Sequence, residues 1–380
     1  MRKVLFVTHH YLAGSGGGVF ASRAYINAFC ELSRSLTLLY PEKNGEKAEG
    51  VNPEVECIPV PYAKPKIFKF LDLVLGRMHR YFGVFEKYLS SADYDTVVFD
   101  TSLVTWKNID IVHKYGAKAI TIHHNYQYEY SRDNNRGLVK LLTLFWIKKY
   151  EKSAVLKSDL NLTLTSDDKS LLKEHYDPIG KSKIEVLGVF EFERRDLPVV
   201  NNDAQSGRYV ITGTLSALQT YKSLKSWIKD YYPILKNSVG FKSLTIAGKD
   251  PSEKLLKLCS QNGIFVVPNP ASMDEVLNNA DVYICQVSLG GGLKLRIMDG
   301  LRYGLPIIAH SVSARGYDSI INKCLFSYSD YGSFADCLES VRIIEFDAEE
   351  IRKMYSAYFS FESGLERIKH IMTNDIKRDY

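Results

Sequence analysis

The residues best suited to chemistry gather in residues 290–309, in the second half of the chain. In order, the reactive or conformationally permissive ones are Gly290, Gly291, Gly292, Lys294, Arg296 and Asp299. Glycines let backbone N–H groups approach an anion closely, and a helix N-terminus favours negative charge. We expect the glycines to open a helix, with Lys294 in its first turn and Asp299 two turns down.

A lysine at a helix N-terminus opposes the helix macrodipole, and a bound diphosphate would relieve that conflict by supplying negative charge. The carboxylate of Asp299 can accept hydrogen bonds from two ribose hydroxyls at once. The block therefore predicts a site for a nucleoside diphosphate. A capped helix with solvated charges is the structural alternative.

A second glycine cluster, Gly16, Gly17 and Gly18, follows the first apolar run and leads into a helix expected near Phe20. A diphosphate can sit at such a loop. Gly16 and Gly18, with the small residue three further on, also satisfy the dinucleotide fingerprint. That fingerprint opens directly off a strand, whereas seven residues separate Thr8 from Gly16. The spacing disfavours a nicotinamide cofactor and leaves a plain flexible loop as the other alternative.

The third cluster is His124 and Asn125, followed by a Tyr-Gln-Tyr-Glu-Tyr run. Histidine and asparagine at the tip of a strand can donate hydrogen bonds to sugar hydroxyls or to a leaving oxygen. Neighbouring aromatic rings offer stacking faces. The cluster fits a polyol substrate, although a histidine–asparagine turn can also be purely structural.

These clusters need strands to position them, and the chain alternates short apolar runs with segments of helical period. Such alternation predicts βαβ units and parallel sheets with helices on both faces. The expected strands of the first half are 4–8, 35–39, 96–100, 117–122 and 159–164. Those of the second half are 209–212, 243–247, 264–267, 281–285 and 306–309.

The expected fold is therefore α/β, with two doubly wound, Rossmann-like parallel-sheet domains facing across a cleft, and ligands at the carboxyl ends of the strands. Residues 191–207 have the composition of an interdomain linker. We expect domains at 1–195 and 205–358. The chain past Leu325 reads as helical, and a C-terminal helix at about 359–380 is expected to pack back on the first domain.

Composition excludes several classes of protein. The 380 residues are 45% hydrophobic and 24% charged with a net charge of +5, as in ordinary globular proteins. No basic, aromatic surface for nucleic acid is evident. The six scattered cysteines read as free structural thiols of a cytoplasmic protein. No signal peptide, membrane span or metal-ligand spacing is recognised.

Residues 62–91 carry apolar side chains at helical spacing, which predicts an amphipathic helix. Its other faces bear six basic and two acidic residues, Lys64, Lys66, Lys69, Arg77, Arg80 and Lys87 against Asp72 and Glu86. One interpretation is a core helix with a soluble basic face. The other is a face that rests on an anionic membrane surface, which would make the protein peripheral on the inner side of the membrane.

Taken together, these motifs resemble family 4 retaining glycosyltransferases of the GT-B fold, in particular the bacterial polysaccharide subgroup with a Gly-Gly-Gly-x-Lys-x-Arg/Lys motif. The resemblance also covers the turn 213–215, the segment 280–282 and the glycine loop 14–18. It implies that a sugar moves from a nucleoside diphosphate sugar to a hydroxyl of a sugar or lipid-linked sugar, with retention, in cell-surface polysaccharide or glycoconjugate synthesis. No bound cofactor and no metal are implied, and the first domain is expected to hold the acceptor.

The resemblance also assigns residues. His124, Asn125 and Lys294 are expected to be catalytic. The donor-binding set is expected to be Gly16, Gly17, Gly18, Gly213, Thr214, Lys222, Gly290, Gly291, Gly292, Arg296 and Asp299.

Four positions depart from the family pattern. Asp299 stands where the family has its second glutamate, and Gly291 where it has the first. Thr214 replaces an arginine and Leu293 a threonine, so Lys222 is a candidate to complete the phosphate site. A GT-B sugar-nucleotide epimerase, or a non-catalytic partner subunit that has lost the first glutamate, are the alternatives.

Overall fold

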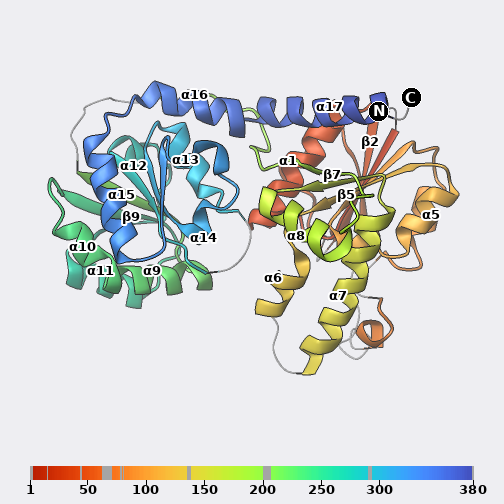
Figure 1. Cartoon of the computed structure of the whole chain (residues 1–380), viewed down its shortest axis with the longest axis horizontal. Helices are drawn as coiled ribbons and strands as arrows, with labels where there is room; N and C mark the ends of the chain where they lie inside the picture. The colour runs from red at the N-terminus through yellow and green to blue at the C-terminus, as the bar shows by residue number, and fades with distance from the viewer. Residues whose placement is uncertain are drawn as a thin grey trace. The chain divides into compact units, whose positions relative to one another are not determined.

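The computed structural model describes residues 3–378 except 15, 43–44, 62–70, 78, 80, 135–137, 200–206 and 290–292. The chain divides into two compact units. Unit 1 comprises Met1–Arg194 and Phe361–Tyr380, and unit 2 comprises Arg195–Ser360. Each unit is a sheet covered by helices (Figure 1).

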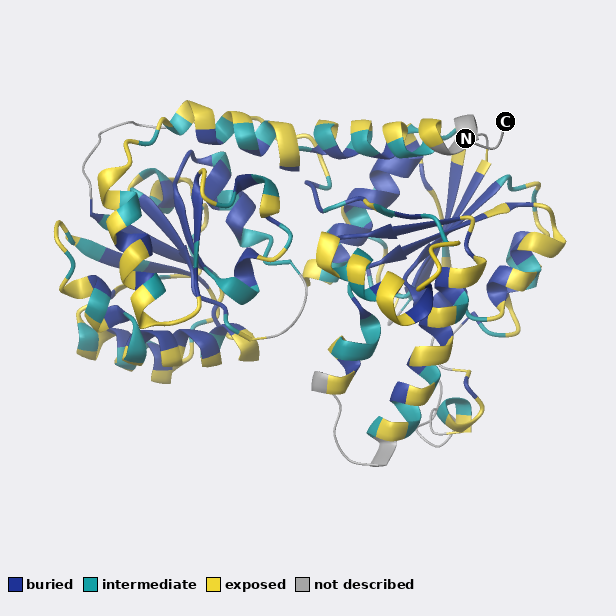
Figure 2. Cartoon of the chain, in the orientation of Figure 1, coloured by how far each residue is buried: buried dark blue, intermediate teal, exposed yellow. Residues whose placement is uncertain are grey.

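The sheet of unit 1 has seven described strands, all parallel, in the order β3-β2-β1-β4-β5-β6-β7. Its central strands are buried along almost their whole length, as is usual when helices cover both faces of a parallel sheet (Figure 2). The strands are β1 (Lys3–Thr8), β2 (Ser35–Glu42), β3 (Glu56–Pro61), β4 (Thr96–Asp100), β5 (Lys118–His123), β6 (Leu160–Thr163) and β7 (Ile184–Val186).

The helices of unit 1 connect successive strands, and the last of them comes from the C-terminal end of the chain. That last helix packs against the first one, and its Gly364 lies directly against the ring of Phe190. The helices are α1 (Gly17–Glu31), α3 (Phe85–Leu89), α4 (Ser102–Thr105), α5 (Asn108–Lys114), α6 (Gln127–Asn134), α7 (Leu138–Lys157), α8 (Ser166–Tyr176) and α17 (Phe361–Arg378).

The sheet of unit 2 repeats the design with six described strands, all parallel, in the order β10-β9-β8-β11-β12-β13. One large core cluster fills it, centred on Trp227, Ile246 and Ile284. The strands are β8 (Arg208–Thr214), β9 (Ser243–Lys249), β10 (Phe265–Pro268), β11 (Val282–Cys285), β12 (Ile307–His310) and β13 (Leu325–Tyr328).

The helices of unit 2 include several single-turn pieces that begin directly after a strand or a loop. They are α9 (Leu218–Asp230), α10 (Tyr232–Lys236), α11 (Glu253–Asn262), α12 (Asp274–Asn278), α13 (Arg296–Arg302), α14 (Ser311–Ala314), the 3₁₀ turn η1 (Asp318–Ile320), α15 (Tyr331–Ile343) and α16 (Ala348–Phe359). The expected α/β class with two parallel-sheet domains is confirmed.

Two expectations about secondary structure are wrong. The chain past Leu325 is not purely helical, because 325–328 form β13. The expected continuous helix over 62–91 is also wrong, because the described residues of this segment do not form one helix. Residues 71–74 are helical, a turn with Gly76 at φ +63° follows, and helix resumes only at Phe85. Lys64, Lys66, Lys69 and Arg80 lie outside the described residues.

The six cysteines are all free, and five of them are buried, as expected for structural thiols; Cys57 is exposed. Within the described residues, no helix is both long enough and apolar enough to cross a bilayer.

Candidate active site

In unit 2 the predicted donor-binding residues lie at the carboxyl ends of adjacent strands. β8 ends at Thr214, β11 at Cys285 and β12 at His310, and β8, β11 and β12 are neighbours in the sheet. The loop after β11 leads to Lys294 and to α13. Parallel strands therefore bring the turn at 213–214 and residues 293–299 to one edge of the sheet.

Arg296 joins two of these segments. Its Nη1 donates to the carbonyl oxygen of Thr212 at 2.9 Å, and its Nη2 to Oγ1 of Thr220 at 3.3 Å. A Cβ atom at Gly213 would lie 2.4 Å from the same guanidinium, and Gly213 has φ +149°. Arg296 thus holds α13 against the end of β8, and a glycine at 213 is what allows this approach.

Lys294 lies two residues before α13, which begins at Arg296. The expectation that Lys294 sits in the first turn of the helix is therefore wrong, and Asp299 is in the first turn rather than two turns down. The backbone carbonyl of Lys294 accepts a hydrogen bond of 3.1 Å from Tyr317. Burial lowers the pKa of the Lys294 ammonium to about 8; Cys285 opposes this shift, and Arg296 and Arg315 add to it.

Asp299 is half-buried in α13, close to several arginines. Burial raises the pKa of its carboxyl group, while Arg302, Arg195 and Arg296 act in the opposite direction. A carboxylate with cationic neighbours at a strand's carboxyl edge is a suitable acceptor for ligand hydroxyls.

Two other predicted donor residues of unit 2 are exposed. Thr214 is exposed at the end of β8, and Lys222 is exposed in the second turn of α9. Their role in donor binding stays a prediction. Gly290, Gly291 and Gly292 lie outside the described residues.

In unit 1 three chemically active side chains meet at the carboxyl ends of β1, β4 and β5. Asp100 ends β4 and is fully buried, and its Oδ1 accepts a hydrogen bond from Nε2 of His124. Its Oδ2 accepts from Oγ1 of Thr8 at 2.6 Å and from Oγ of Ser22 at 2.5 Å. His10 packs against His124 with ring centroids 5.2 Å apart.

Charges within this cluster perturb its acid–base behaviour. Burial by itself raises the pKa of Asp100, but the charge and hydrogen bond of His124, together with His10, hold that pKa well below its usual range. Burial, aided by His9 and His124, lowers the pKa of His10. Sequence reasoning singled out His124 but missed Asp100, although an aspartate that closes a run of buried apolar residues was a usable signal.

The glycine loop of unit 1 belongs to the same cluster. Gly16 caps α1 with extended backbone, and Gly17 and Gly18 form its first turn, so the helix begins earlier than Phe20. A Cβ atom at Gly18 would lie 2.7 Å from the ring of His10. The absence of a side chain at 18 therefore lets His10 pack over the start of the helix.

Two buried or half-buried carboxylates fix the turn that carries His124 and Asn125. Asp168 accepts from the backbone N–H of Tyr126 at 2.7 Å. Glu151 accepts from the backbone N–H groups of residues 127 and 128, at 2.5 and 3.2 Å. Among the described residues Oδ1 of Asn125 is buried without a hydrogen-bond partner, so it can accept from a ligand.

His10, Asp100 and His124 also form the one group among the described residues with the composition of a metal site, their candidate ligand atoms lying within 4.8 Å of one another. The direct bond from His124 to Asp100 requires a proton on Nε2, and a protonated nitrogen cannot bind a metal. The arrangement is that of a hydrogen-bonded pair.

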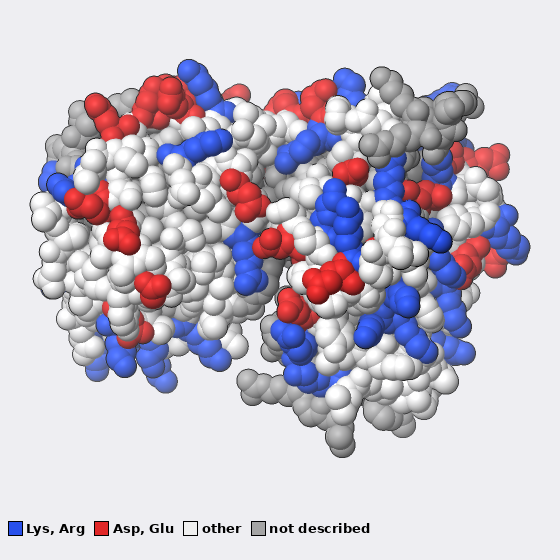
Figure 3. Space-filling model, in the orientation of Figure 1, with Lys and Arg blue, Asp and Glu red and all other residues white. Residues whose placement is uncertain are grey.

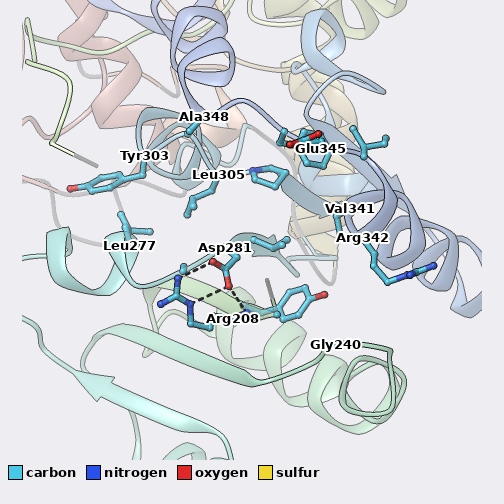
Figure 4. A pocket seen from close by; sticks show the side chains of 18 of the residues that line it. Arg208, Gly240, Leu277, Asp281, Tyr303, Leu305, Val341, Arg342, Glu345 and Ala348 are labelled. Atoms are coloured by element: carbon cyan, nitrogen blue, oxygen red, sulfur yellow. Dashed lines mark hydrogen bonds and ion pairs between the residues drawn. The ribbon is translucent and has the colours of Figure 1, made fainter. Parts of the chain in front are cut away.

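A separate pocket of about 660 Å³ lies at the opposite edge of the unit 2 sheet (Figure 4). Arg208 begins β8, and Asp281 and Pro306 immediately precede β11 and β12, so these lining residues mark the amino ends of the strands. Arg208 and Asp281 form an ion pair of 2.9 Å there. None of the predicted donor residues lines this pocket.

Comparisons with known proteins add a family and a fold. Residues 207–342 match the family described as glycosyl transferases group 1. No curated protein matches the chain. Several solved structures resemble it over nearly its whole length.

The chain is similar to the lipopolysaccharide outer core galactosyltransferase WaaB, with 13% identity, complete coverage of both chains and a TM-score of 0.65. It is also similar to sucrose-phosphate synthase from Thermosynechococcus elongatus, with 13% identity, complete coverage of both chains and a TM-score of 0.71. HepE from Anabaena, solved with UDP, shares 10% identity over 98% of this chain and all of its own, with a TM-score of 0.64.

At these low sequence identities, the structural similarity establishes the fold alone. The family match falls within unit 2 and spans β8 to α15, including every predicted donor residue of that unit. Residues 207–342 are therefore a glycosyl transferases group 1 domain, and the chain as a whole has the GT-B fold.

Proposed function

We propose that this protein is a glycosyltransferase that uses a nucleoside diphosphate sugar. The observation that carries the proposal is the family match to unit 2, at the strand edge where Gly213, Lys294, Arg296 and Asp299 converge. A cation, a half-buried carboxylate and a glycine turn at this edge are what a diphosphate linked to a ribose requires.

In this proposal Asp299 accepts hydrogen bonds from the ribose hydroxyls, and Lys294 stabilises the diphosphate as negative charge grows during its departure. His124 and Asn125 bind and orient the sugar. Uridine is the first base to test, because HepE was solved with UDP and with UDP-glucose. The sugar would pass to a hydroxyl acceptor with retention of configuration and without a metal, in cell-surface polysaccharide or glycoconjugate synthesis.

Donor binding can be tested without knowing the acceptor. A thermal-shift panel of UDP, GDP, ADP and dTDP sugars should single out one base, because a ligand at 100 times its dissociation constant adds about 2.7 kcal/mol of stability. Absence of a response to every nucleotide sugar would contradict the proposal.

The reaction can then be followed with the donor so identified. Incubation with simple sugars and lipid-linked sugars should give a glycoside whose anomeric configuration, read by NMR, matches the donor. Conversion of the donor to an epimer without acceptor would indicate an epimerase instead. Binding with neither transfer nor hydrolysis would indicate a non-catalytic subunit.

We also propose that unit 1 binds the surface of an anionic membrane, which would give access to a lipid-linked acceptor. Support comes from α7, where Leu141 and Phe145 are 69% and 51% exposed. Leu71, Val74 and Leu75 add exposed apolar area beside α7, because Gly76 lies against the ring of Trp146 on that helix.

Exposed lysines follow the apolar residues along α7. Lys148, Lys149 and Lys152 are exposed on α7, and Lys149 lies over the ring of Phe145 at 4.4 Å. Glu151, the acidic residue of α7, is fully buried. Figure 3 shows Lys and Arg side chains over this part of unit 1. Each such cation near an anionic surface contributes about 1 kcal/mol.

Sedimentation with anionic and neutral vesicles tests membrane binding. We expect binding to anionic vesicles that weakens with salt and that a Leu141→Asp, Phe145→Asp variant loses. Ile179, 73% exposed elsewhere in unit 1, provides the control variant Ile179→Asp. Equal recovery of the wild-type protein in the supernatant with both vesicle types would contradict membrane binding.

A further inference from the structure

Asp100 has the burial and the hydrogen bonds of a carboxylate that orients another side chain. It is fully buried, and all the groups bonded to it are donors: the hydroxyls of Thr8 and Ser22 on Oδ2 and the imidazole of His124 on Oδ1. A buried charge is tolerated only when such donors surround it. The two hydroxyls hold Oδ2 in place, and the other oxygen, Oδ1, faces the histidine.

The backbone next to Asp100 is also constrained. Thr101 has φ 125° and ψ 153°, a conformation that non-glycine residues rarely adopt. Its hydroxyl accepts from the backbone N–H of Leu103 and so starts α4. Strained residues of this kind persist when the surrounding structure over-determines them, and they cluster at functional sites. Here the strain falls immediately after the residue that contacts His124.

The hydrogen bond has a chemical consequence for the imidazole. An ionised carboxylate only accepts hydrogen bonds, so the nitrogen facing it, Nε2, must carry a proton. The nitrogen that remains for any other partner is Nδ1. In a neutral histidine this fixes the tautomer, which otherwise interconverts freely.

We infer that Asp100 is a positioning residue for His124: it fixes the Nε2–H form of the imidazole, so that Nδ1 is the atom His124 uses on the substrate. The effect of Asp100 on catalysis rests on the proposed glycosyl transfer. The tautomer of His124 does not depend on that proposal. Asp100 itself is enclosed by protein and touches no substrate.

The other titratable groups near the pair come from three elements. His9 and His10 follow β1, and Tyr25 on α1 lies edge-on to His124 with ring centroids 5.9 Å apart. Tyr25 donates to the carbonyl oxygen of Gly188 at 2.8 Å, and Arg367 of α17 acts on it electrostatically. None of these groups accepts the Nε2 proton, since Asp100 already does.

The kinetic test is Asp100→Asn, because an amide of the same size can present N–H to His124 and stabilise the opposite tautomer. We expect kcat to fall about 10²- to 10⁴-fold with donor KM changed less than about threefold. In a His124→Ala background the same change should alter kcat less than about threefold, because Asp100 acts through the histidine.

The matched control is Asp177→Asn. Asp177 is also buried in unit 1, but its carboxylate accepts from the backbone N–H groups of residues 181 and 182. We expect it to change thermal stability without changing kcat. Full loss of kcat in both variants would show that Asp100→Asn acts through the fold, and an additive effect in the double variant would show that Asp100 acts independently of His124; either overturns the inference.

A spectroscopic readout is independent of activity. In the wild-type protein labelled with ¹⁵N-histidine, the His124 signals, identified by their loss in His124→Ala, should show a protonated Nε2 from pH 6 to 9. An unprotonated Nε2 overturns the inference even if the enzyme is active. Added Zn²⁺ should leave these signals unchanged; perturbation of His10 and His124 together would show a metal site in place of the pair.

Discussion

Asp299 and Lys294 are the residues on which the proposed donor site depends most directly, and each supports a prediction. Asp299→Ala should weaken binding of the nucleotide sugar, because each lost hydrogen bond to a charged acceptor costs roughly 1.5 to 3 kcal/mol. Calorimetry with the donor identified by thermal shift measures this. Asp336→Ala, an exposed aspartate of α15, is the control and should bind the donor normally. Unchanged affinity in Asp299→Ala would remove Asp299 from the site.

The charge state of Lys294 predicts that kcat/KM depends on pH. An ammonium is charged below its pKa, and burial sets the pKa of Lys294 at about 8. The cation is therefore present at pH 7 and is lost as the pH rises through about 8, so kcat/KM should fall above that pH. In Lys294→Arg the fall should disappear, because the guanidinium stays protonated. A wild-type profile that is flat to pH 9.5 would show that Lys294 does not meet the diphosphate.

Lys294→Ala separates binding from catalysis. If the ammonium interacts with charge that develops as the diphosphate leaves, kcat should fall more than donor affinity. Steady-state kinetics alongside direct binding distinguishes the two. Equal losses would indicate uniform binding of donor and transition state.

Residue types in the motifs predicted which residues unit 2 brings to one edge of its sheet, but they did not predict what each of these residues contacts. Arg296 was expected to bind the donor, yet two of its nitrogens bond to Thr212 and Thr220. Asp100 was missed because its importance arises from contact with His124, which follows a different strand and lies 24 residues further along the chain. Such a pairing depends on strand order, which no local pattern encodes.

At the scale of elements, the join between β8 and α13 is sensitive to a single methyl group at position 213. Gly213→Ala places a Cβ against the guanidinium of Arg296 in a backbone conformation unfavourable for alanine. We expect thermal unfolding at a lower temperature, corresponding to a loss of more than about 1 kcal/mol. Donor binding should weaken as well, since the turn belongs to the proposed donor site.

The control for this prediction is Gly263→Ala. Gly263 also has positive φ, at the end of α11, but a Cβ there meets nothing within 4 Å. It therefore measures the backbone penalty without the clash, and should cost less stability than Gly213→Ala. Equal losses in the two variants would mean that the contact with Arg296 adds nothing.

The strands that sequence reasoning missed, β3, β7 and β13, are three of the four sheet edges. β3 contains Pro59 and Pro61, which are excluded from central strands but tolerated on an edge. β7 and β13 have only three and four residues. Central strands are predictable because burial on both faces demands continuous apolar runs. An edge strand needs fewer apolar residues, so its sequence pattern is weaker.

For the molecule as a whole, we predict that glycosyl transfer persists in excess EDTA. The one metal-type group among the described residues is already satisfied internally by the bond between Asp100 and His124. Turnover assayed with and without chelator decides this. Loss of activity in EDTA with recovery in Mg²⁺ or Mn²⁺ would establish a metal requirement.

The last helix gives the two units an unusual order of completion during synthesis. Unit 2 ends at Ser360, whereas unit 1 requires α17, whose Gly364 and Arg367 pack on Phe190 and Gly188. A ribosome that adds about 5 to 20 residues per second normally lets the first-made domain finish folding first. Here the second-encoded unit has all its residues before the first. Until α17 emerges from the ribosome, unit 1 lacks the helix that packs against α1, so the nascent protein carries a complete unit 2 beside an incomplete unit 1.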